Sequence, residues 1–363
     1  MSIVHFLQKR VDKIRNILKQ YNCDAFISLC PIYNRYFSGF TGSTSALLVT
    51  LEKSYFLTDF RYEEQVGKEV FNFTVIIVSG ELVNNLFQLI NSLKIQKIAI
   101  HTEKISLQLA EKLKENCKVE LVGINDALSQ LRMVKEGFEI ETIRNACKIT
   151  ETSIYNCMSA LKEGVTEREI ASRIDYEFRL QGADGSAFDT IVLFGKNSSL
   201  PHGKPGDKKL SIGDIVLIDC GCIYKGYCSD LTRTFVLGVI PGTWFIDMYE
   251  TVLSAQLSAL SVLCPGKYSN EIDNIARSYI SGKGFGKYFG HGLGHGVGME
   301  IHEPPRLNTD SSSILKEGFI ITIEPGIYIP DKGGVRIEDT VLITNDGYER
   351  LTTSNKDLIV LPV

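Results

Sequence analysis

Five side chains of the types that bind metal ions are spread through the second half of the sequence, each in a glycine-rich or strand-like segment. They are four carboxylates and one imidazole: Asp219, Asp230, His295, Glu324 and Glu338. Asp219 ends the apolar run IVLID, and an ionised carboxylate at the end of a buried strand needs a compensating cation. Without metal, clustered carboxylates would repel one another and some would take up protons. The set therefore predicts a two-metal hydrolytic centre.

The charges and donor types of this set indicate which ions it would hold. Two divalent cations would balance the four carboxylates, and carboxylates with one imidazole favour Mn, Co, Fe or Zn over Mg or Ca. We expect two ions per chain, with Mn as the first choice and Co, Zn or Fe as alternatives. Cys220 and Cys222 flank Gly221 directly after Asp219. As thiolates they would select soft metals, but we expect them to fill a buried strand as small apolar residues.

A hairpin and a glycine-rich segment would position the first three ligands. Alternate side chains of a strand share a face, so a hairpin with its turn at residues 224–226 can offer Asp219 and Asp230 to one ion. The segment GHGLGHGVG contains His291 and His295. Its five glycines make a poor helix or strand and let the backbone approach a ligand closely. The segment predicts that one of the two histidines binds metal.

Glu324 and Glu338 belong to two β-rich runs that should pair with each other. Glu324 begins EPG, and the proline favours extended backbone before it, in a buried strand IITIEPGIYI that we expect Gly326 to interrupt. Glu338 lies in VRIEDTVLI, which would pair back against that strand. Arg336 lies two residues before Glu338 on the same strand face. It would either form a structural ion pair with Glu338 or orient a metal ligand.

Length and charge argue against several other classes of protein. A chain of 363 residues is long for a single core and suggests two domains. The net charge of −4 and the pI near 6.0 supply no broad basic field for nucleic-acid phosphates or anionic lipid. No apolar stretch approaches the roughly 18 residues that a membrane span requires. We expect neither a nucleic acid nor a membrane as partner.

The N-terminus and the cysteines indicate the cellular compartment. The segment MSIVHFLQKRVDKIRNILKQ carries basic residues among apolar ones at helix spacing, so it lacks the apolar core of a signal peptide and should be a helix. The nine cysteines are odd in number and form no pair of CxxC knuckles, so most should be reduced and buried. These features predict a cytoplasmic protein.

The pattern of apolar residues divides the chain into domains of residues 1–131 and 132–363. In the first, strand-like runs such as CDAFISL and FTVIIVS alternate with amphipathic helical stretches, which is typical of an α/β domain. In the second, a long helical run begins near Leu131 and should end at Gly164. A further helix should begin at a capping box of Thr166 and Glu169 and end at Gly182. Helices that alternate with antiparallel strands predict an α+β domain.

The ordered motifs PHGKPGD, IDCG, SDLTRTF, GHGLGHGVGMEIHEPPR, TIEPGIYIP and GGVRIEDTVLI resemble those of the creatinase/prolidase-type metallopeptidases, which have the pita-bread fold. The resemblance is strongest to Xaa-Pro dipeptidases (prolidases) and Xaa-Pro aminopeptidases. It spans the whole chain, because NRYFSGFTGSTSALLVT and LTDFRYEEQ resemble the small N-terminal domain of those enzymes. It implies a pita-bread catalytic domain that hydrolyses Xaa-Pro bonds in dipeptides or short peptides. It also implies a homodimer, with the N-terminal domain forming the dimer or shaping the cleft.

The resemblance also implies a role for each ligand. Asp219 and Asp230 would hold one ion, and Asp230 would share the other with His295 and Glu324. Glu338 would bridge both ions. A hydroxide between the ions would be the nucleophile. Creatinase lacks this complete set, which argues against the first alternative, a creatinase-like amidinohydrolase. The second alternative is a catalytically silent binding protein of the same fold, which would also be expected to have lost ligands.

Further residues match family positions that line the substrate cleft. Glu324 would move the proton from water to the leaving proline nitrogen. His302 and His202 would stabilise the tetrahedral intermediate and the scissile amide, and His291 would contact the residue on the carboxyl side. Arg306, in HEPPR, lies where prolidase-like enzymes bind the carboxylate of a dipeptide. The alternative is an ordinary surface arginine, in which case longer Xaa-Pro peptides fit.

Overall fold

A computed structural model gives the backbone of residues 3–363 and the side chains from residue 4 onward. The chain divides into two compact units, one up to Arg132 and the other over Met133–Val363. The first two residues of the expected opening helix lie outside the described part of the chain, and the rest of that segment is helical.

The first unit is built on a mixed sheet with the strand order β4-β3-β2-β1-β5-β6. The strands are β1 (Ala25–Ser28), β2 (Ala46–Thr50), β3 (Ser54–Asp59), β4 (Thr74–Val78), β5 (Lys97–Ile100) and β6 (Glu120–Gly123). The helices are α1 (Ile3–Gln20), α2 (Pro31–Ser38), α3 (Glu63–Glu69), α4 (Leu82–Ser92), α5 (Leu107–Cys117) and α6 (Asn125–Met133). Strand β2 pairs antiparallel with β1 and β3, and the other pairs are parallel. The predicted α/β class is confirmed.

The alternation of side chains along β1 explains how this sheet is covered. Ala25 and Ile27 pack with Leu86 of α4 and Leu113 of α5 in one apolar cluster. Phe26 points to the other face, where its ring meets that of Phe37 in α2 at a centroid distance of 5.6 Å. Both faces of the strand are therefore buried, which explains why CDAFISL reads as a continuous apolar run.

The second unit has four helices and several short sheets within residues 133–363. The helices are α7 (Gly137–Cys157), α8 (Glu167–Leu180), α9 (Thr243–Leu260) and α10 (Ser269–Gly282). The first strands are β7 (Gly185–Ser186), β8 (Ile191–Phe194), β9 (Ile215–Cys220), β10 (Cys222–Tyr224), β11 (Tyr227–Cys228) and β12 (Leu231–Leu237). The later strands are β13 (Gly294–Gly296), β14 (Glu303–Leu307), β15 (Ile320–Ile323), β16 (Gly326–Ile329), β17 (Gly333–Arg336), β18 (Asp339–Ile343), β19 (Tyr348–Arg350) and β20 (Val360–Leu361).

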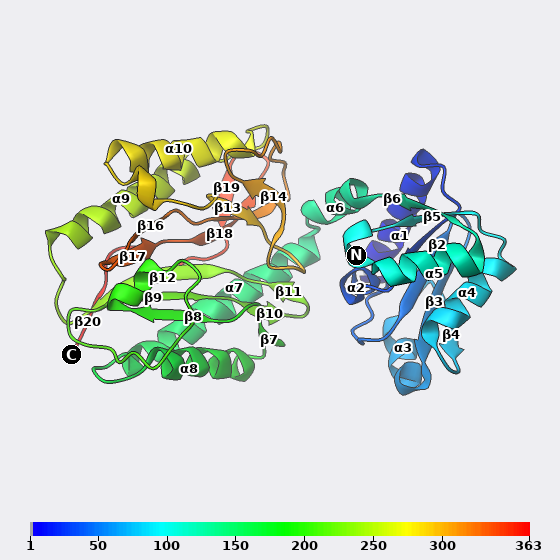
Figure 1. Cartoon of the computed structure of the whole chain (residues 1–363), viewed down its shortest axis with the longest axis horizontal. Helices are drawn as coiled ribbons and strands as arrows, with labels where there is room; N and C mark the ends of the chain where they lie inside the picture. Colours follow the sequence, from blue (N-terminus) through cyan, green and yellow to red (C-terminus); the bar gives the residue numbers. More distant parts are fainter. Residues whose placement is uncertain (1–2) are drawn as a thin grey trace. The chain divides into compact units, whose positions relative to one another are not determined.

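The strands of this unit form a layer with helices on both sides. Helices α7 and α8 lie on one side and α9 and α10 on the other (Figure 1). Two sheets make up most of the layer, in the orders β20-β12-β9-β8 and β14-β13-β15-β18-β19. Pairing is antiparallel in both except between β12 and β20. Apolar clusters fill the space between these strands and each helix pair, and the predicted pita-bread class is confirmed.

Three local predictions need correction. The expected helix from Leu131 to Gly164 is interrupted after Met133, because Lys135 donates its backbone N–H to the carbonyl of Gly318 and a capping box begins α7 at residue 137. The strand IITIEPGIYI breaks at residues 324–325, and Gly326 begins the next strand. The segment GHGLGHGVG contains the short strand β13 around His295, although glycine is a poor strand former. The capping box of α8 is confirmed.

Candidate metal centre

Asp219 and Asp230 reach the same place from neighbouring strands. Strand β9 pairs antiparallel with β12, and Asp219 lies opposite Thr232. Because alternate residues share a face, Asp230, two positions before Thr232, lies on the same side as Asp219. Asp230 is only 5% exposed. Both aspartates line one cavity of about 690 Å³.

Only one of the two carboxylate oxygens of Asp219 has a hydrogen-bond partner in the protein. Its Oδ2 accepts a hydrogen bond from Arg336 Nη2 at 2.5 Å, while its Oδ1 is buried without a hydrogen-bond partner among residues 3–363. Arg336 also donates to the Tyr328 hydroxyl at 2.6 Å and to Thr232 Oγ1 at 3.0 Å. Arg336 thus forms its ion pair with Asp219, whereas one of the two alternatives from the sequence was an ion pair with Glu338. A buried carboxylate oxygen without a hydrogen-bond donor fits a bound cation.

His295 lies between strands that approach too closely for larger neighbours. A Cβ on Gly294 would be 2.0 Å from the Thr322 carbonyl oxygen, and one on Gly296 would be 2.3 Å from that of Pro304. The glycines are therefore required by the close backbone of β15 and β14. This constraint explains why a glycine-rich segment forms a strand here.

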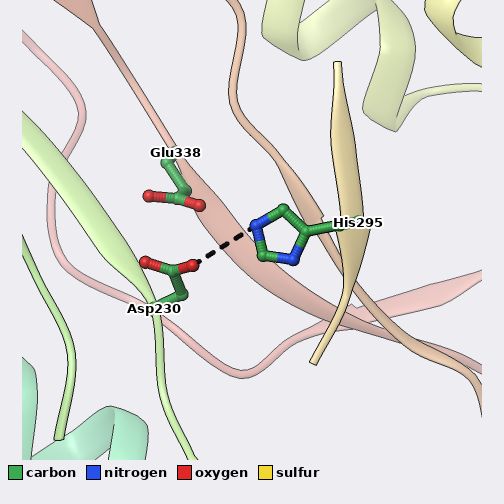
Figure 2. Close-up of side chains that lie close together, drawn as sticks. All are labelled: Asp230, His295 and Glu338. Atoms are coloured by element: carbon green, nitrogen blue, oxygen red, sulfur yellow. Dashed lines mark ion pairs between the residues drawn. The ribbon is translucent and has the colours of Figure 1, made fainter. Parts of the chain in front are cut away.

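The ring of His295 presents one nitrogen to the acidic residues. Its Nδ1 lies 3.0 Å from the carbonyl oxygen of Gly296, so Nδ1 carries the proton in the neutral ring. Nε2 then directs its lone pair toward Asp230 Oδ2 at 3.5 Å, the contact that is dashed in Figure 2, and toward Glu324 Oε1 at 3.4 Å. Burial lowers the pKa of His295 to about 3, so the ring stays neutral at pH 7. A lone pair that faces two carboxylates fits a bound cation between them.

Glu324 and Glu338 lie at breaks between strands. Glu324 follows β15, and its Oε1 accepts a hydrogen bond from Thr322 Oγ1 at 3.3 Å. Glu338 lies between β17 and β18, and its Oε2 accepts from Thr232 Oγ1 at 2.8 Å. The ligand atoms of Asp230, His295 and Glu338 all lie within 4.8 Å of one another. This donor set fits a divalent ion.

Burial and mutual repulsion favour the protonated forms of Asp230, Glu324 and Glu338 when no metal is present. Burial raises the pKa of Asp230 well above its usual range, and the charges of Glu338 and Asp219 raise it further. Burial and then Glu324 do the same for Glu338, and burial raises the pKa of Glu324 to about 8. The cluster is therefore not stable in the fully ionised form unless cations compensate it.

We expect metal binding to release protons at pH 7. Because burial raises the pKa of Glu324 to about 8, this residue holds a proton at pH 7 that a bound ion would displace. The raised pKa values of Asp230 and Glu338 act in the same direction, so metal affinity should rise with pH. Calorimetric titration of metal-free protein with Mn²⁺ in two buffers of different ionisation enthalpy measures this release. Glu324→Gln, which removes one titrating group, should release fewer protons. Equal heats of binding in both buffers would contradict the expectation.

The other predicted site residues line the same cavity. His202, His302 and Arg306 are exposed there, and His291 is partly buried. His291 Nε2 lies 3.0 Å from the Tyr328 hydroxyl, and burial lowers its pKa to about 4. The ring of His302 packs against His295 at a centroid distance of 4.4 Å. The structure thus brings together every residue of the predicted site.

Arg306 is placed by strand pairing. Strand β14 pairs with β13 so that Arg306 lies opposite His295, and opposed residues share a face. The exposed guanidinium of Arg306 forms no hydrogen bond or ion pair with any residue of the described chain. It is available to bind an anion at the cavity.

The sequence did not indicate the hydroxyl groups around the ligands, whereas the expected burial of Cys220 and Cys222 among apolar residues is confirmed. Thr232 and Tyr328 contact ligands or Arg336; the position of Thr232, two after Asp230, was the available signal. Cys220 and Cys222 are buried in the apolar cluster with α7 and α8. Burial raises the pKa of both thiols. All nine cysteines are free, and seven of them are buried.

Comparison with known proteins identifies the family. Residues 141–345 match the model of metallopeptidase family M24, and residues 10–134 match that of the creatinase/prolidase N-terminal domain. The fold and the match define the protein as a metallopeptidase. The chain belongs to metallopeptidase family M24, which confirms the resemblance seen in its motifs.

Relatives match over nearly their full length. The chain is 38% identical to the Xaa-Pro dipeptidase of Pyrococcus furiosus, with 97% of this chain and 100% of that one covered. The structure of an Xaa-Pro dipeptidase from Bacillus anthracis superposes with a TM-score of 0.95 at 35% identity, covering 98% of this chain and 100% of the other. An X-Pro aminopeptidase from Thermotoga maritima gives a TM-score of 0.89 at 39% identity, covering 93% and 98%. No helix within residues 3–363 has the length and apolar character to cross a membrane.

Proposed function

We propose that the protein is a two-metal Xaa-Pro peptidase that hydrolyses the bond before proline in dipeptides or short peptides. The observation that carries the proposal is the meeting of Asp230, His295 and Glu338 within 4.8 Å, in the cavity that Asp219 and Glu324 also line. The names of the relatives, two dipeptidases and an aminopeptidase, support the substrate class.

The five ligands would divide between two divalent ions, with Mn expected first and Co, Zn or Fe as alternatives. Asp219 and Asp230 would hold one ion, and Asp230, His295 and Glu324 the other, while Glu338 would contact both. Bound ions would supply an activated water as nucleophile and would polarise the scissile carbonyl. The buried, partnerless Asp219 Oδ1 and the lone pair of His295 Nε2 support this division.

The remaining side chains would bind the substrate and move protons. Glu324 would accept the proton of the attacking water and deliver it to the proline nitrogen, which leaves as an amine. His302 and His202, exposed in the cavity, would donate hydrogen bonds to the scissile amide and to the oxyanion of the tetrahedral intermediate. His291, neutral at pH 7 because burial lowers its pKa to about 4, would contact the residue on the carboxyl side.

The substrate class can be tested with four small peptides. Metal-free protein reconstituted with Mn²⁺, Co²⁺ or Zn²⁺ should release alanine from Ala-Pro or Ala-Pro-Ala and should leave Ala-Ala and Pro-Ala almost intact. We expect a preference for proline of about 100-fold in kcat/KM, equivalent to about 2.7 kcal/mol. Hydrolysis of none of the peptides with any metal would contradict the proposal. Metal binding without hydrolysis would favour the silent binding protein, and creatine hydrolysis the amidinohydrolase.

Arg306→Ala is expected to weaken dipeptide binding. The unpaired guanidinium can donate two hydrogen bonds to a free carboxylate, and charge-assisted bonds contribute about 1.5–3 kcal/mol, so KM for Ala-Pro should rise about 10- to 100-fold. Ala-Pro-amide lacks that carboxylate and should be unaffected, and Arg306→Lys should rescue Ala-Pro binding only in part. An equal loss for Ala-Pro and Ala-Pro-amide would show that Arg306 does not bind the carboxylate.

We also propose the assembly that the family resemblance implies. The unit up to Arg132 would form a homodimer or shape the cleft, and the protein would act in the cytoplasm. Sedimentation equilibrium that gives the mass of a single chain would contradict the dimer.

A further inference from the structure

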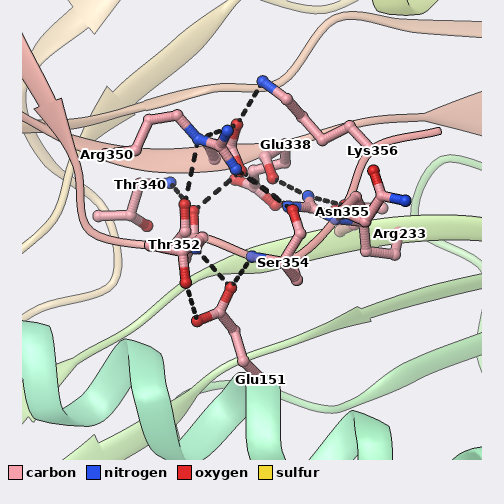
Figure 3. Close-up of polar contacts among 12 residues, drawn as sticks. Glu151, Arg233, Glu338, Thr340, Arg350, Thr352, Ser354, Asn355 and Lys356 are labelled. Carbon is pink, nitrogen blue, oxygen red and sulfur yellow. Dashed lines mark hydrogen bonds and ion pairs between the residues drawn. The ribbon is translucent and has the colours of Figure 1, made fainter.

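A buried ionic cluster surrounds Asp339, the residue after Glu338. The Asp339 side chain is fully buried. Figure 3 shows the polar contacts of this region, with Arg233, Arg350 and Lys356 among the labelled residues. Its Oδ1 accepts a hydrogen bond from Arg233 Nη2 at 2.9 Å, and its Oδ2 accepts one from Lys356 Nζ at 2.9 Å. Arg350 Nε lies 3.2 Å from the same Oδ2. Within residues 3–363 none of these four residues lines the cavity, so the cluster does not contact substrate.

The cluster ties the C-terminal segment, residues 352–356, to the rest of the unit. Thr352 Oγ1 donates to Asp339 Oδ1 at 3.0 Å, and Lys356 also donates to Gln256 Oε1 of α9 at 2.8 Å. From the other side, Glu151 of α7 accepts the backbone N–H groups of residues 353 and 354. A carboxylate is costly to bury unless it is fully paired. The C-terminal segment therefore supplies hydrogen-bond donors to the Asp339 carboxylate that β18 alone does not provide.

Arg233 connects the cluster to the ligand Glu338. Its Nη1 donates to the backbone carbonyl of Glu338 and, at 2.9 Å, to that of Thr232. Thr232 in turn donates through Oγ1 to Glu338 Oε2 at 2.8 Å and accepts the Glu338 backbone N–H at 3.2 Å. The peptide groups on both sides of Glu338 and its carboxylate are therefore held by two adjacent residues of β12.

Thr340 connects the cluster to the ligand Asp230. Its Oγ1 donates to the backbone carbonyl of Asp230 at 2.8 Å, and its own N–H donates to Thr352 Oγ1 at 3.1 Å. The residue before Asp339 is thus the ligand Glu338, and the residue after it, Thr340, holds the backbone of the ligand Asp230. A displacement of Asp339 would move both ligands.

We propose that Asp339 is a positioning residue for the metal centre. Its ion pair with Arg233, together with the hydrogen bonds that it accepts from Lys356 and Thr352 of the C-terminal segment, sets the positions of Glu338 and Asp230. The inference rests on the proposed metal centre. It predicts that the cluster controls metal affinity and turnover, although it touches neither metal nor substrate. Residues that orient metal ligands typically change affinity or activity about 10- to 100-fold when replaced.

The test compares two variants of the cluster with a ligand variant and a control. Asp339→Asn removes the charge and keeps the shape. Arg233→Lys keeps the charge of the pair but loses the donors to the Glu338 carbonyl, and it decides the question if Asp339→Asn does not fold. Glu338→Gln is the reference for a lost ligand. Asp214→Asn is the control, because Asp214 pairs with Lys208 at 2.9 Å and does not line the cavity. Mn²⁺ dissociation constants, kcat and KM for Ala-Pro, and the Tm of the metal-free proteins are measured.

Both cluster variants should raise the dissociation constant of the weaker Mn²⁺ ion, and lower kcat at saturating metal, about 10-fold or more, with KM within about twofold of wild type. Asp214→Asn should change only the Tm. The proposal is overturned if the cluster variants lower the Tm of the metal-free protein and leave Mn²⁺ affinity and kcat within about twofold of wild type. Because the affinities are compared without reference to hydrolysis, a wild-type protein that binds Mn²⁺ but cleaves no peptide would overturn the proposed function alone.

Discussion

Asp230→Asn is expected to lose one of the two bound metal ions and to abolish peptide hydrolysis. Asp230 Oδ2 lies 3.5 Å from His295 Nε2, and the ligand atoms of Asp230 and Glu338 lie within 4.8 Å of each other. Asp230 would therefore bind both ions. The asparagine side chain carries no charge, and its NH₂ group replaces one of the two carboxylate oxygens that would bind an ion. We expect kcat/KM for Ala-Pro to fall on the order of 1,000-fold or more, equivalent to about 4 kcal/mol of transition-state stabilisation.

A control in the same cavity separates this effect from a general loss of acidity. Asp189 also lines the cavity, but its side chain is 93% exposed and lies 3.9 Å from Lys204. Asp189→Asn should retain both ions and most of the activity. Metal content by elemental analysis is the primary measurement, and the metal-free variants are compared by thermal unfolding. An Asp230→Asn protein that keeps two ions would show the ligand assignment to be wrong.

Removal of the metal is expected to destabilise the second unit strongly. An ion that binds only the folded state adds RT ln(1 + [L]/Kd), which is about 2.7 kcal/mol at a hundredfold excess over Kd. At about 2–4 °C for each kcal/mol in a domain of this size, the Tm should fall about 5–11 °C for each ion removed. Thermal unfolding with and without chelator measures the change. Equal Tm values after confirmed metal loss would contradict the account.

The effect of metal removal should also depend on pH. Burial raises the pKa of Glu324 to about 8, above that of the unfolded chain, so its contribution to the stability of the metal-free protein is fully present below the unfolded pKa. That contribution is lost as the pH rises through about 8. The gap in Tm between metal-bound and metal-free protein should therefore widen from pH 5 to pH 8. Glu324→Gln, which cannot ionise, should show a smaller widening.

The sequence was sufficient for the family, the fold class and the grouping of the site residues. Asp219 and Asp230 could be placed together because a hairpin register follows from strand periodicity. Two neighbouring β-rich runs predicted the pairing of the strands that carry Glu324 and Glu338, and β15 with β18 and β16 with β17 bear it out. The turn between β16 and β17 lies at residues 330–332. These features are local, or they depend on motifs whose order is specific to the family.

Other features depend on contacts between distant segments. The partner of Arg336 is Asp219, 117 positions away, whereas the sequence suggested the nearby Glu338. Arg233 reaches Asp339 across 106 positions. The break after Met133 arises from a hydrogen bond to Gly318. Periodicity reports the face of an element but not the polar group that another element brings to it.

The most direct test of the two-metal peptidase is a titration of metal-free protein with Mn²⁺ in which bound ions and the release of alanine from Ala-Pro are measured in the same samples. We predict that hydrolysis is absent without metal and reaches its maximum as the second ion per chain binds. Full hydrolysis by metal-free protein, or no hydrolysis with two ions bound per chain, would contradict the account.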